Sequence, residues 1–441
     1  MNRLDDFFSI TKRGSTLRRE ITGGLATFMT MAYIIFVQPQ VMKAAGMDTG
    51  AVFTATCLAS ALACFIMGIA ANFPIAQAPL MGENFFFVYA VVLGMGISWQ
   101  RALGLVFLSG IVFLLLNLTK IRALLVNSIP DSLKYAISAG IGLFITFLGM
   151  KDGGLIVPAD GTIVKLGPVT SFPVLITIIG LLVMWIFMAR KKSGAILAGM
   201  AVCALIAWCG GLMHFDGAVS MPPSLAPTFM QLDLHGLFHP DMISPVVMFL
   251  FLAVFDTLGT LVGVGIQGGF VKDGKFEGVE RAMISDSVAT AVGACLGTST
   301  VSSYIESATG VAQVARTGLA AVTVGILFLL SLFLSPLLGA IDVSAAAGSM
   351  QLHPITAPAL IIVGALMMNT VRLIHWDDVT EYFPAFLTLA MIPFTGNIAD
   401  GIAAGFIAYP LGKTATGRAK EVSVSAWIVA IIFVLRYLFF K

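Results

Sequence analysis

The chain has 441 residues, of which 58% are hydrophobic and 11% are charged. Soluble domains carry about 25% charged residues, whereas apolar runs of the length that crosses a bilayer, about 20 residues, recur along this sequence. These features exclude a soluble globular protein and indicate a polytopic protein embedded in a lipid bilayer, and the net charge of +2 gives no reason to expect a nucleic-acid partner.

The chain begins with a charged stretch at 1–20, which lacks the apolar core and cleavage site of a secretory signal and is therefore predicted to be a cytoplasmic N-terminal segment. Fourteen apolar segments are expected after it, at about 22–41, 52–71, 81–94, 101–119, 132–149, 169–189, 194–213, 242–266, 280–297, 302–314, 317–339, 353–370, 383–395 and 398–412. A basic linker and a C-terminal apolar helix follow within 413–441. The sequence leaves open whether 422–440 spans the bilayer or lies along its inner face.

Lysines and arginines alternate between the two sides that this segment count defines. They are frequent in the loops expected on the side of the N-terminus, as at 190–192, and absent from the long loop 214–241. Because cytoplasmic loops carry the excess of basic residues, we expect a cytoplasmic N-terminus and a protein of the cell (inner or plasma) membrane.

The segments divide into two halves of seven, 21–213 and 242–412, separated by an external loop at 214–241. An odd number per half inverts the second half, which predicts an all-α membrane protein built from two inverted seven-segment repeats. The third segment of each half is interrupted: PIAQAPLMGENFFFVYAVVLG in the first and LGTSTVSSYIESATGVA in the second. Prolines, serines and threonines at 74–79 and 298–303 predict short extended stretches that lead into half-helices.

Paired interruptions of this kind indicate a substrate site near the bilayer midplane. An acidic residue lies close to the start of each half-helix, Glu83 in the first and Glu306 in the second. A carboxylate at the bilayer centre costs about 2.5–3.5 kcal/mol on insertion scales, so each such residue needs an explanation. Glu306 is therefore a candidate for contact with substrate or proton.

Asp256 follows ten apolar residues of the eighth segment. It is predicted to face a substrate or proton path, and the alternative is a structural hydrogen bond through Thr257 or Thr260. Glycines at 259 and 263 are expected to permit close approach of a neighbouring helix. Asp286, in the ninth segment, is balanced evenly between a proton-coupling role and a structural bond to the serines and threonines of 298–303.

No lysine or arginine lies in the interior of the segments that form this site. Four acids without basic partners argue against an anionic substrate and suit a neutral ligand rich in N–H donors, or a coupling cation. A carboxylate that gains a proton on one side and loses it on the other would perform proton symport, for which Glu306, Asp256 and Asp286 are the candidates. Phe85 and Phe255 could stack on a flat ring, with helix packing as the alternative.

Motifs of hydrolases, nucleotide-binding loops and metal sites are absent from the sequence. We therefore expect a transporter rather than an enzyme, with no cofactor and no bound metal. An ion channel, which also uses half-helices, would differ in that its flux would not respond to collapse of the proton gradient.

Several stretches resemble the adenine/guanine/hypoxanthine (AzgA-like) purine permease branch of the nucleobase–ascorbate transporter family. They include GGLATFMTMAYIIFVQPQ (23–40), APLMGENFFFVYA (78–90), VFDTLGTLVGV (254–264) and GTSTVSSYIESATGVA (297–312). The resemblance covers nearly the whole chain. It implies fourteen segments in two inverted repeats with core and gate domains, and import of purine nucleobases. Matched by motif, Asp256, Glu306 and Asn84 would bind the base.

Glu83 departs from the family pattern, which resembles APxMGLNAFF and has leucine at this position. We hypothesise that Glu83 faces Glu306 and contacts the ligand or a proton; the alternative is that it caps its half-helix through the amides of Asn84 and Phe85. The departure leaves the preferred base open, with xanthine or uracil as alternatives to adenine, guanine or hypoxanthine. A less favoured reading is an anion carrier of the same seven-plus-seven plan. A homodimer is a further expectation.

Overall fold

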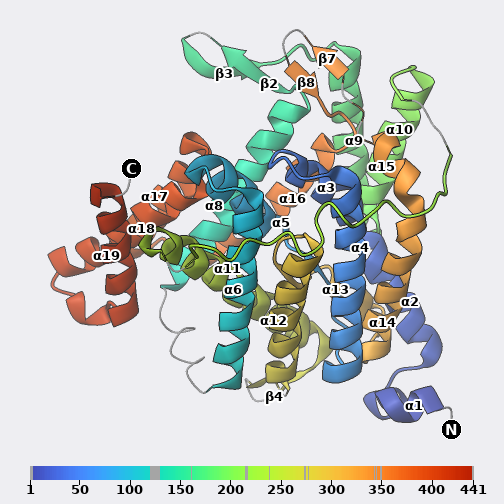
Figure 1. Ribbon diagram of the computed structural model, residues 1–441, viewed down its shortest axis with the longest axis horizontal. Helices are drawn as coiled ribbons and strands as arrows, with labels where there is room; N and C mark the ends of the chain where they lie inside the picture. The colour runs from blue at the N-terminus through green and yellow to red at the C-terminus, as the bar shows by residue number, and fades with distance from the viewer. Residues whose placement is uncertain are drawn as a thin grey trace.

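The computed structural model describes residues 3–119, 130–159, 161–213, 217–237, 239–272, 275–276, 278–341, 343, 345–347 and 350–439 (Figure 1). Lys120 and Arg122, which contribute to the predicted charge asymmetry, lie outside these ranges. Within the described residues, seven helices are long and apolar enough to span a membrane, and four shorter apolar helices accompany them.

The first repeat opens with a short helix and a turn, α1 (Arg3–Phe8) and η1 (Thr11–Arg13). Its first segment is broken into α2 (Leu17–Met31) and α3 (Ile34–Lys43). The second is α4 (Thr49–Ile66), which ends in a π-helical turn, η2 (Met67–Ala71). The third consists of β1 (Gln77–Pro79), α5 (Met81–Phe85) and a π-helix, η3 (Phe86–Gly94), and the fourth is α6 (Trp99–Leu118).

The second repeat contains corresponding elements in the same order. They are α11 (Pro240–Gly268), α12 (Val279–Leu296), β6 (Val301–Ser303), α13 (Ser307–Ala312), α14 (Gly318–Ser331), η4 (Leu332–Leu334) and α15 (Ser335–Ile341). The two repeats interleave, since α4 packs on α12 and α14, α6 packs on α11 and α12, and α2 packs on α13 and α14. These helices form one body, which we call the core domain.

The remaining helices form a second body, which we call the gate domain. From the first repeat it takes α8 (Asp131–Asp152), α9 (Phe172–Ala189) and α10 (Ala195–Cys209); from the second it takes α16 (Ala357–Met367), η5 (Met368–Leu373), α17 (Val379–Thr395) and α18 (Ile398–Ala415). Here too the repeats interleave, because α8 packs on α16 and α17. Short hairpins, β2–β3 (Ile156–Ala159, Thr162–Leu166), β4–β5 (Val271–Lys272, Lys275–Phe276) and β7–β8 (Ala345–Ala347, Met350–Leu352), join helices outside these bodies.

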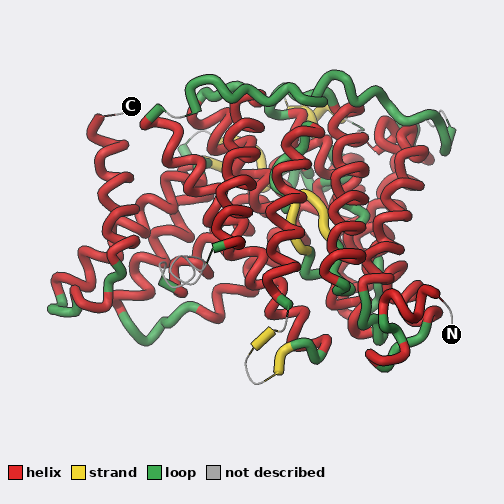
Figure 2. Tube along the Cα trace, turned by 60° about the horizontal axis from the view of Figure 1, so that its bottom comes forward, coloured by secondary structure: helices red, strands yellow, loops and turns green. Residues whose placement is uncertain are grey.

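The last helix, α19 (Val424–Phe439), follows a turn, η6 (Ala419–Glu421), and runs back along α18. Near its end, the Tyr437 hydroxyl donates to Asp400 Oδ1 at the start of α18, at 2.7 Å. In Figure 2 the C-terminus lies on the side of the long loop that precedes α11, and the N-terminus lies on the opposite side. Helix α19 therefore stands upright beside α18 and does not lie flat along one face.

Candidate functional site

The centre of the core domain is formed by two short antiparallel strands, which Figure 2 shows at mid-height among the helices. Strand β1 pairs with β6 in the register Gln77↔Ser303 and Pro79↔Val301. The backbone amide of Leu80 donates to the Thr300 carbonyl at 3.1 Å. The predicted extended stretches of the third and tenth segments are thus confirmed, and their pairing satisfies backbone groups that hydrocarbon could not.

The carboxylate of Asp286, on α12, connects this strand pair to α11 through hydrogen bonds. This carboxylate, fully buried, accepts hydrogen bonds from the hydroxyls of Thr257 (2.7 Å), Ser302 (2.7 Å) and Ser303 (2.9 Å) and from the Ser303 amide (3.1 Å). The side-chain amide of Gln77 donates a fifth bond. These donors fix the carboxylate in place as an acceptor that links the two elements. The arrangement is the structural bond to 298–303 that the sequence left as one alternative for Asp286.

Asn84 belongs to a second buried network at the start of the first half-helix. Its side-chain oxygen accepts a hydrogen bond from Ser299. The side-chain amide of Gln38, on α3, lies 3.2 Å from Thr298 Oγ1 and 3.4 Å from Ser299 Oγ. Asn84 is fully buried, so in this conformation it connects α5 to the stretch that precedes β6.

Asp256 and Glu306 differ from these groups because their side chains are not fully enclosed by the protein. Asp256 lies on the exposed side of α11 and Glu306, at the start of α13, is half-buried. The two carboxylates interact electrostatically with one another, and Asp256 also interacts with Asp286. Glu306 Oε1 accepts a hydrogen bond of 3.2 Å from Tyr33, at the break between α2 and α3. Two acids of the second repeat, one on α11 and one at the start of α13, therefore border accessible space beside the strand pair.

The two glycines near Asp256 are predicted to permit close approach of a neighbouring helix, and only one of them lies close to another segment. A Cβ on Gly259 would meet nothing within 4 Å, whereas one on Gly263 would lie 3.3 Å from the Ile305 side chain. The prediction that Gly259 permits close helix packing is therefore wrong. Gly259 lies one turn from Asp256 on the same face of α11 and leaves the space in front of the carboxylate open.

Glu83 lies deeper than Asp256. Its side chain is 2% exposed, and neither carboxylate oxygen has a hydrogen-bond partner among the described residues. The N-cap of α5 is Leu80, with no side-chain capping bond, so the alternative that Glu83 caps its half-helix is wrong. Glu83 interacts electrostatically with Asp256 and Asp286.

The two aromatic candidates, Phe85 and Phe255, also differ in how deeply they are buried. Phe85 is buried, stacks on Tyr89 with ring centroids 5.5 Å apart and lies edge-on to Phe144 of α8 at 6.5 Å. Phe255 is half-buried, and the Lys134 ammonium lies 4.7 Å from the centre of its ring. Of these two phenylalanines, only Phe255 borders accessible space in this conformation.

Sequence reasoning missed Tyr33, Gln77 and Lys134 as neighbours of the site. Tyr33 and Gln77 stand in apolar runs with nothing in the local pattern to distinguish them. Lys134 begins a gate segment, so its sequence position predicts a loop charge, whereas the fold brings it over Phe255 of the core. These are contacts between distant segments, and only the tertiary arrangement reveals them.

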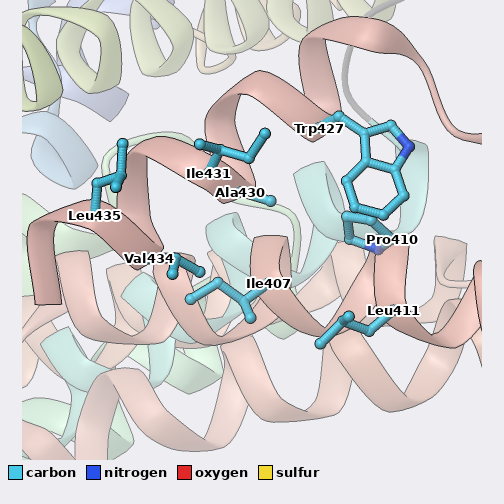
Figure 3. Close-up of a pocket in the computed structure, with 8 residues that line it drawn as sticks. All are labelled: Ile407, Pro410, Leu411, Trp427, Ala430, Ile431, Val434 and Leu435. Carbon is cyan, nitrogen blue, oxygen red and sulfur yellow. The ribbon is translucent and has the colours of Figure 1, made fainter. Parts of the chain in front are cut away.

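An apolar groove lies on the outer side of the gate domain, between α18 and α19 (Figure 3). This groove of about 170 Å³ is lined by apolar side chains that include Ile407, Pro410 and Leu411 of α18 and Trp427, Ile431 and Val434 of α19. It contains no group that could recognise a polar ligand. The substrate site is therefore sought beside the strand pair and not here.

Comparison with known proteins identifies the family of this chain. The sequence profile of the Permease family matches residues 18–404. The chain is 46% identical to the guanine/hypoxanthine permease PbuG of Bacillus subtilis (99% of each chain covered), and 42% identical to the adenine permease AdeP of Escherichia coli (99% of this chain, 96% of the relative).

Among solved structures, the murine Solute Carrier 26 member A9 anion transporter, in its inward-facing state, superimposes with a TM-score of 0.64. The identity is 11%, with 94% of this chain and 72% of that chain covered, so this likeness concerns the fold. It confirms the predicted architecture of two inverted seven-segment repeats. By its sequence match over nearly its full length, the chain belongs to the permeases of the nucleobase–ascorbate transporter family.

Proposed function

We propose that this protein imports purine nucleobases across the cell membrane by proton symport, with the core and gate domains giving access to each side in turn. The observation that carries the proposal is the pair of accessible carboxylates, Asp256 and Glu306, beside two paired strands in the middle of a membrane protein. The purine permeases among the relatives, which take adenine or guanine and hypoxanthine, support the choice of ligand.

The chemistry of these groups suits a neutral base. Ring and exocyclic N–H groups donate to carboxylates, and charge-assisted hydrogen bonds are about twice as strong as neutral ones. Asp256 and Glu306 would accept from the base, while Phe255 would offer a ring face for stacking. Tyr33 would hold Glu306 in place through its hydroxyl. Asn84, Glu83 and Phe85 remain predicted site residues. They are more deeply buried than the three residues proposed to contact the base.

Proton coupling requires a carboxyl group whose protonation changes with base occupancy. The candidates are Glu306, Asp256 and Asp286. The accessibility of Glu306 and Asp256 favours them over Asp286, whose buried carboxylate is bound into the fold by five donors.

The proposed orientation has the N-terminus in the cytoplasm. Arg13 and Arg316 lie together at the N-terminal side of the molecule, where the Arg13 guanidinium donates to the Arg316 carbonyl at 3.1 Å. This clustering of basic residues follows the positive-inside rule. We also keep the homodimer as a prediction, with the gate helices as its expected interface, and cross-linking in native membranes would test it.

Two alternatives concern the substrate. Transport of xanthine or uracil would use the same acceptor groups, and Glu83 is the departure that could alter the choice. Anion transport, as in the structurally similar carrier, is less favoured, because the groups at the accessible site are carboxylates and a neutral or cationic ligand suits them better.

The experiment is uptake into proteoliposomes that contain the purified protein. Radiolabelled adenine, guanine and hypoxanthine are supplied with and without an inward proton gradient, and each unlabelled base, with xanthine and uracil, is tested as a competitor. We expect accumulation of at least one purine that collapses with a protonophore. Accumulation driven only by a sodium gradient, or none of any base, would contradict the proposal.

A further inference from the structure

Glu83 differs from the other acids of the site because its carboxyl group is buried without hydrogen-bond partners among the described residues. Both of its oxygens lack a hydrogen bond of normal geometry among the described residues, and so does the hydroxyl of Thr300, which lies close enough to interact with the carboxyl group. Asp286, by contrast, has five donors. The ion pairs formed by the described residues include none with Glu83.

These surroundings disfavour a charge on Glu83. An ionised carboxylate that is buried with no cation, and with the Thr300 hydroxyl as its one nearby donor, is strongly disfavoured, whereas the neutral acid can donate its one O–H to Thr300 Oγ1. The titratable groups that face Glu83 are Asp256 of α11, Asp286 of α12 and Tyr304, which follows β6. None of these can supply a positive charge.

We propose that Glu83 is the proton-binding group of the transport cycle, and that a base binds at Asp256 and Glu306 only while Glu83 holds its proton. The inference rests on the proposed function, proton-coupled import of a base. The N–H groups of a base hold Asp256 in its carboxylate form. A second charge on Glu83 would then repel it across an apolar gap, so the base and the proton favour one another.

This coupling is reciprocal, as any linkage between two binding equilibria must be. A base stabilises the proton on Glu83, and the proton stabilises the bound base. In this cycle the Glu83 proton would exchange with water through the accessible space beside Asp256, which the bound base would occupy. Departure of the base therefore opens the path by which the proton leaves, on the same side of the membrane.

The test compares Glu83→Gln, which imitates the neutral acid and cannot release a proton, with Glu280→Gln as control. Glu280 is exposed at the start of α12. In proteoliposomes, Glu83→Gln should still exchange labelled for unlabelled base, because exchange needs no net movement of protons. Its accumulation driven by a proton gradient should fall at least tenfold, and its affinity for the base should no longer depend on pH. Glu280→Gln should behave as the wild type, and Glu83→Asp should retain coupling in part.

A measurement on the wild type guards against a variant that fails to fold. Infrared difference spectroscopy should show the carbonyl band of a buried carboxylic acid that weakens when base is removed, and Glu83→Asp should shift that band. A wild type that ignores the proton gradient would overturn the proposed function itself. A gradient-driven wild type together with an equally gradient-driven Glu83→Gln would overturn the assignment of Glu83 and leave the proposed function standing. A folded Glu83→Gln that binds no base would also overturn it, in favour of direct contact with the ligand.

Discussion

Asp286 and Asp256 lie on neighbouring core helices, yet one organises the fold and the other faces accessible space. In Asp286→Asn an NH₂ group replaces one oxygen, so at least one of five donors loses its acceptor. Each buried polar group left unsatisfied costs about 1–3 kcal/mol, so we expect the detergent-solubilised variant to unfold at a clearly lower temperature. Asp256→Asn should unfold near the wild-type temperature while uptake is lost. Equal unfolding temperatures for the two variants would contradict this division of roles.

Gly259 offers a direct test of where the base binds. A Cβ fits there without a clash, since nothing lies within 4 Å of its position, and leucine is the better helix former by up to about 1 kcal/mol. Gly259→Leu should therefore fold normally but fill the space beside Asp256, and we expect base affinity to fall more than tenfold in competition assays. Gly259→Ala should have a smaller effect. Wild-type affinity in the leucine variant would place the site elsewhere.

Between elements, the core depends on one very close backbone contact. A Cβ on Gly318, the first residue of α14, would lie 1.9 Å from the Gly68 carbonyl oxygen in η2. Gly318→Ala must push these two elements apart, and overpacking of this kind costs about 1–3 kcal/mol. We expect a lower unfolding temperature. Gly412→Ala, in α18, is the matched control, because a Cβ added at Gly412 would meet nothing within 4 Å and alanine favours the helix. This variant should be neutral or slightly stabilising.

An ion-pair cluster joins α17, α18 and the turn before α19, and its contribution depends on pH. Lys413 lies 2.8 Å from Glu381 and 2.9 Å from Glu421, and Arg418 lies 2.6 Å from Asp378. Hydrogen bonds from Thr380 and Arg418 hold the pKa of Asp378 well below its usual range. Bonds from Arg418 and Lys413 lower the pKa of Glu421 to about 2.

A depressed pKa in the folded state stabilises the fold at any pH above the unfolded value, about 4.3 for glutamate. For Glu421 that stabilisation should disappear as the pH falls from about 5 toward 2. We expect Glu421→Gln to unfold at a lower temperature than the wild type at pH 7, with a difference that narrows steadily below pH 5. The measurement is thermal unfolding of both proteins across this range. A difference that does not change with pH would show that charge is not its source.

For the whole molecule, the predictable features are those that a local pattern determines. Prolines, serines and threonines before each half-helix predict the extended stretches that form β1 and β6, because such residues disfavour helix, whereas the pairing of the two strands is seen only in the structure. The bond from Tyr33 to Glu306 and the position of Lys134 over Phe255 could not be predicted. Each joins segments more than a hundred residues apart, and their geometry depends on how the two repeats interlock.

The direction in which the site opens follows from α11. Its accessible residues Asp256, Gly259, Val262 and Ile266 share one face, and a face that carries a carboxylate does not border lipid. This face runs toward the end of α11 that lies opposite the long loop. The conformation is therefore inward-facing if the N-terminus is cytoplasmic, as proposed.

Cysteine labelling tests both the direction and the orientation. In a background without the native cysteines, Ile266→Cys should react with a membrane-impermeant maleimide in inside-out vesicles and be protected in right-side-out cells. Val219→Cys, in the long loop and 69% exposed, should show the reverse. A base should slow labelling of Gly259→Cys, because it would occupy the space beside Asp256. Reaction of Ile266→Cys from the outer side alone would mean that the chain is oriented the other way, and equal reaction from both sides would describe an open pore and not a carrier.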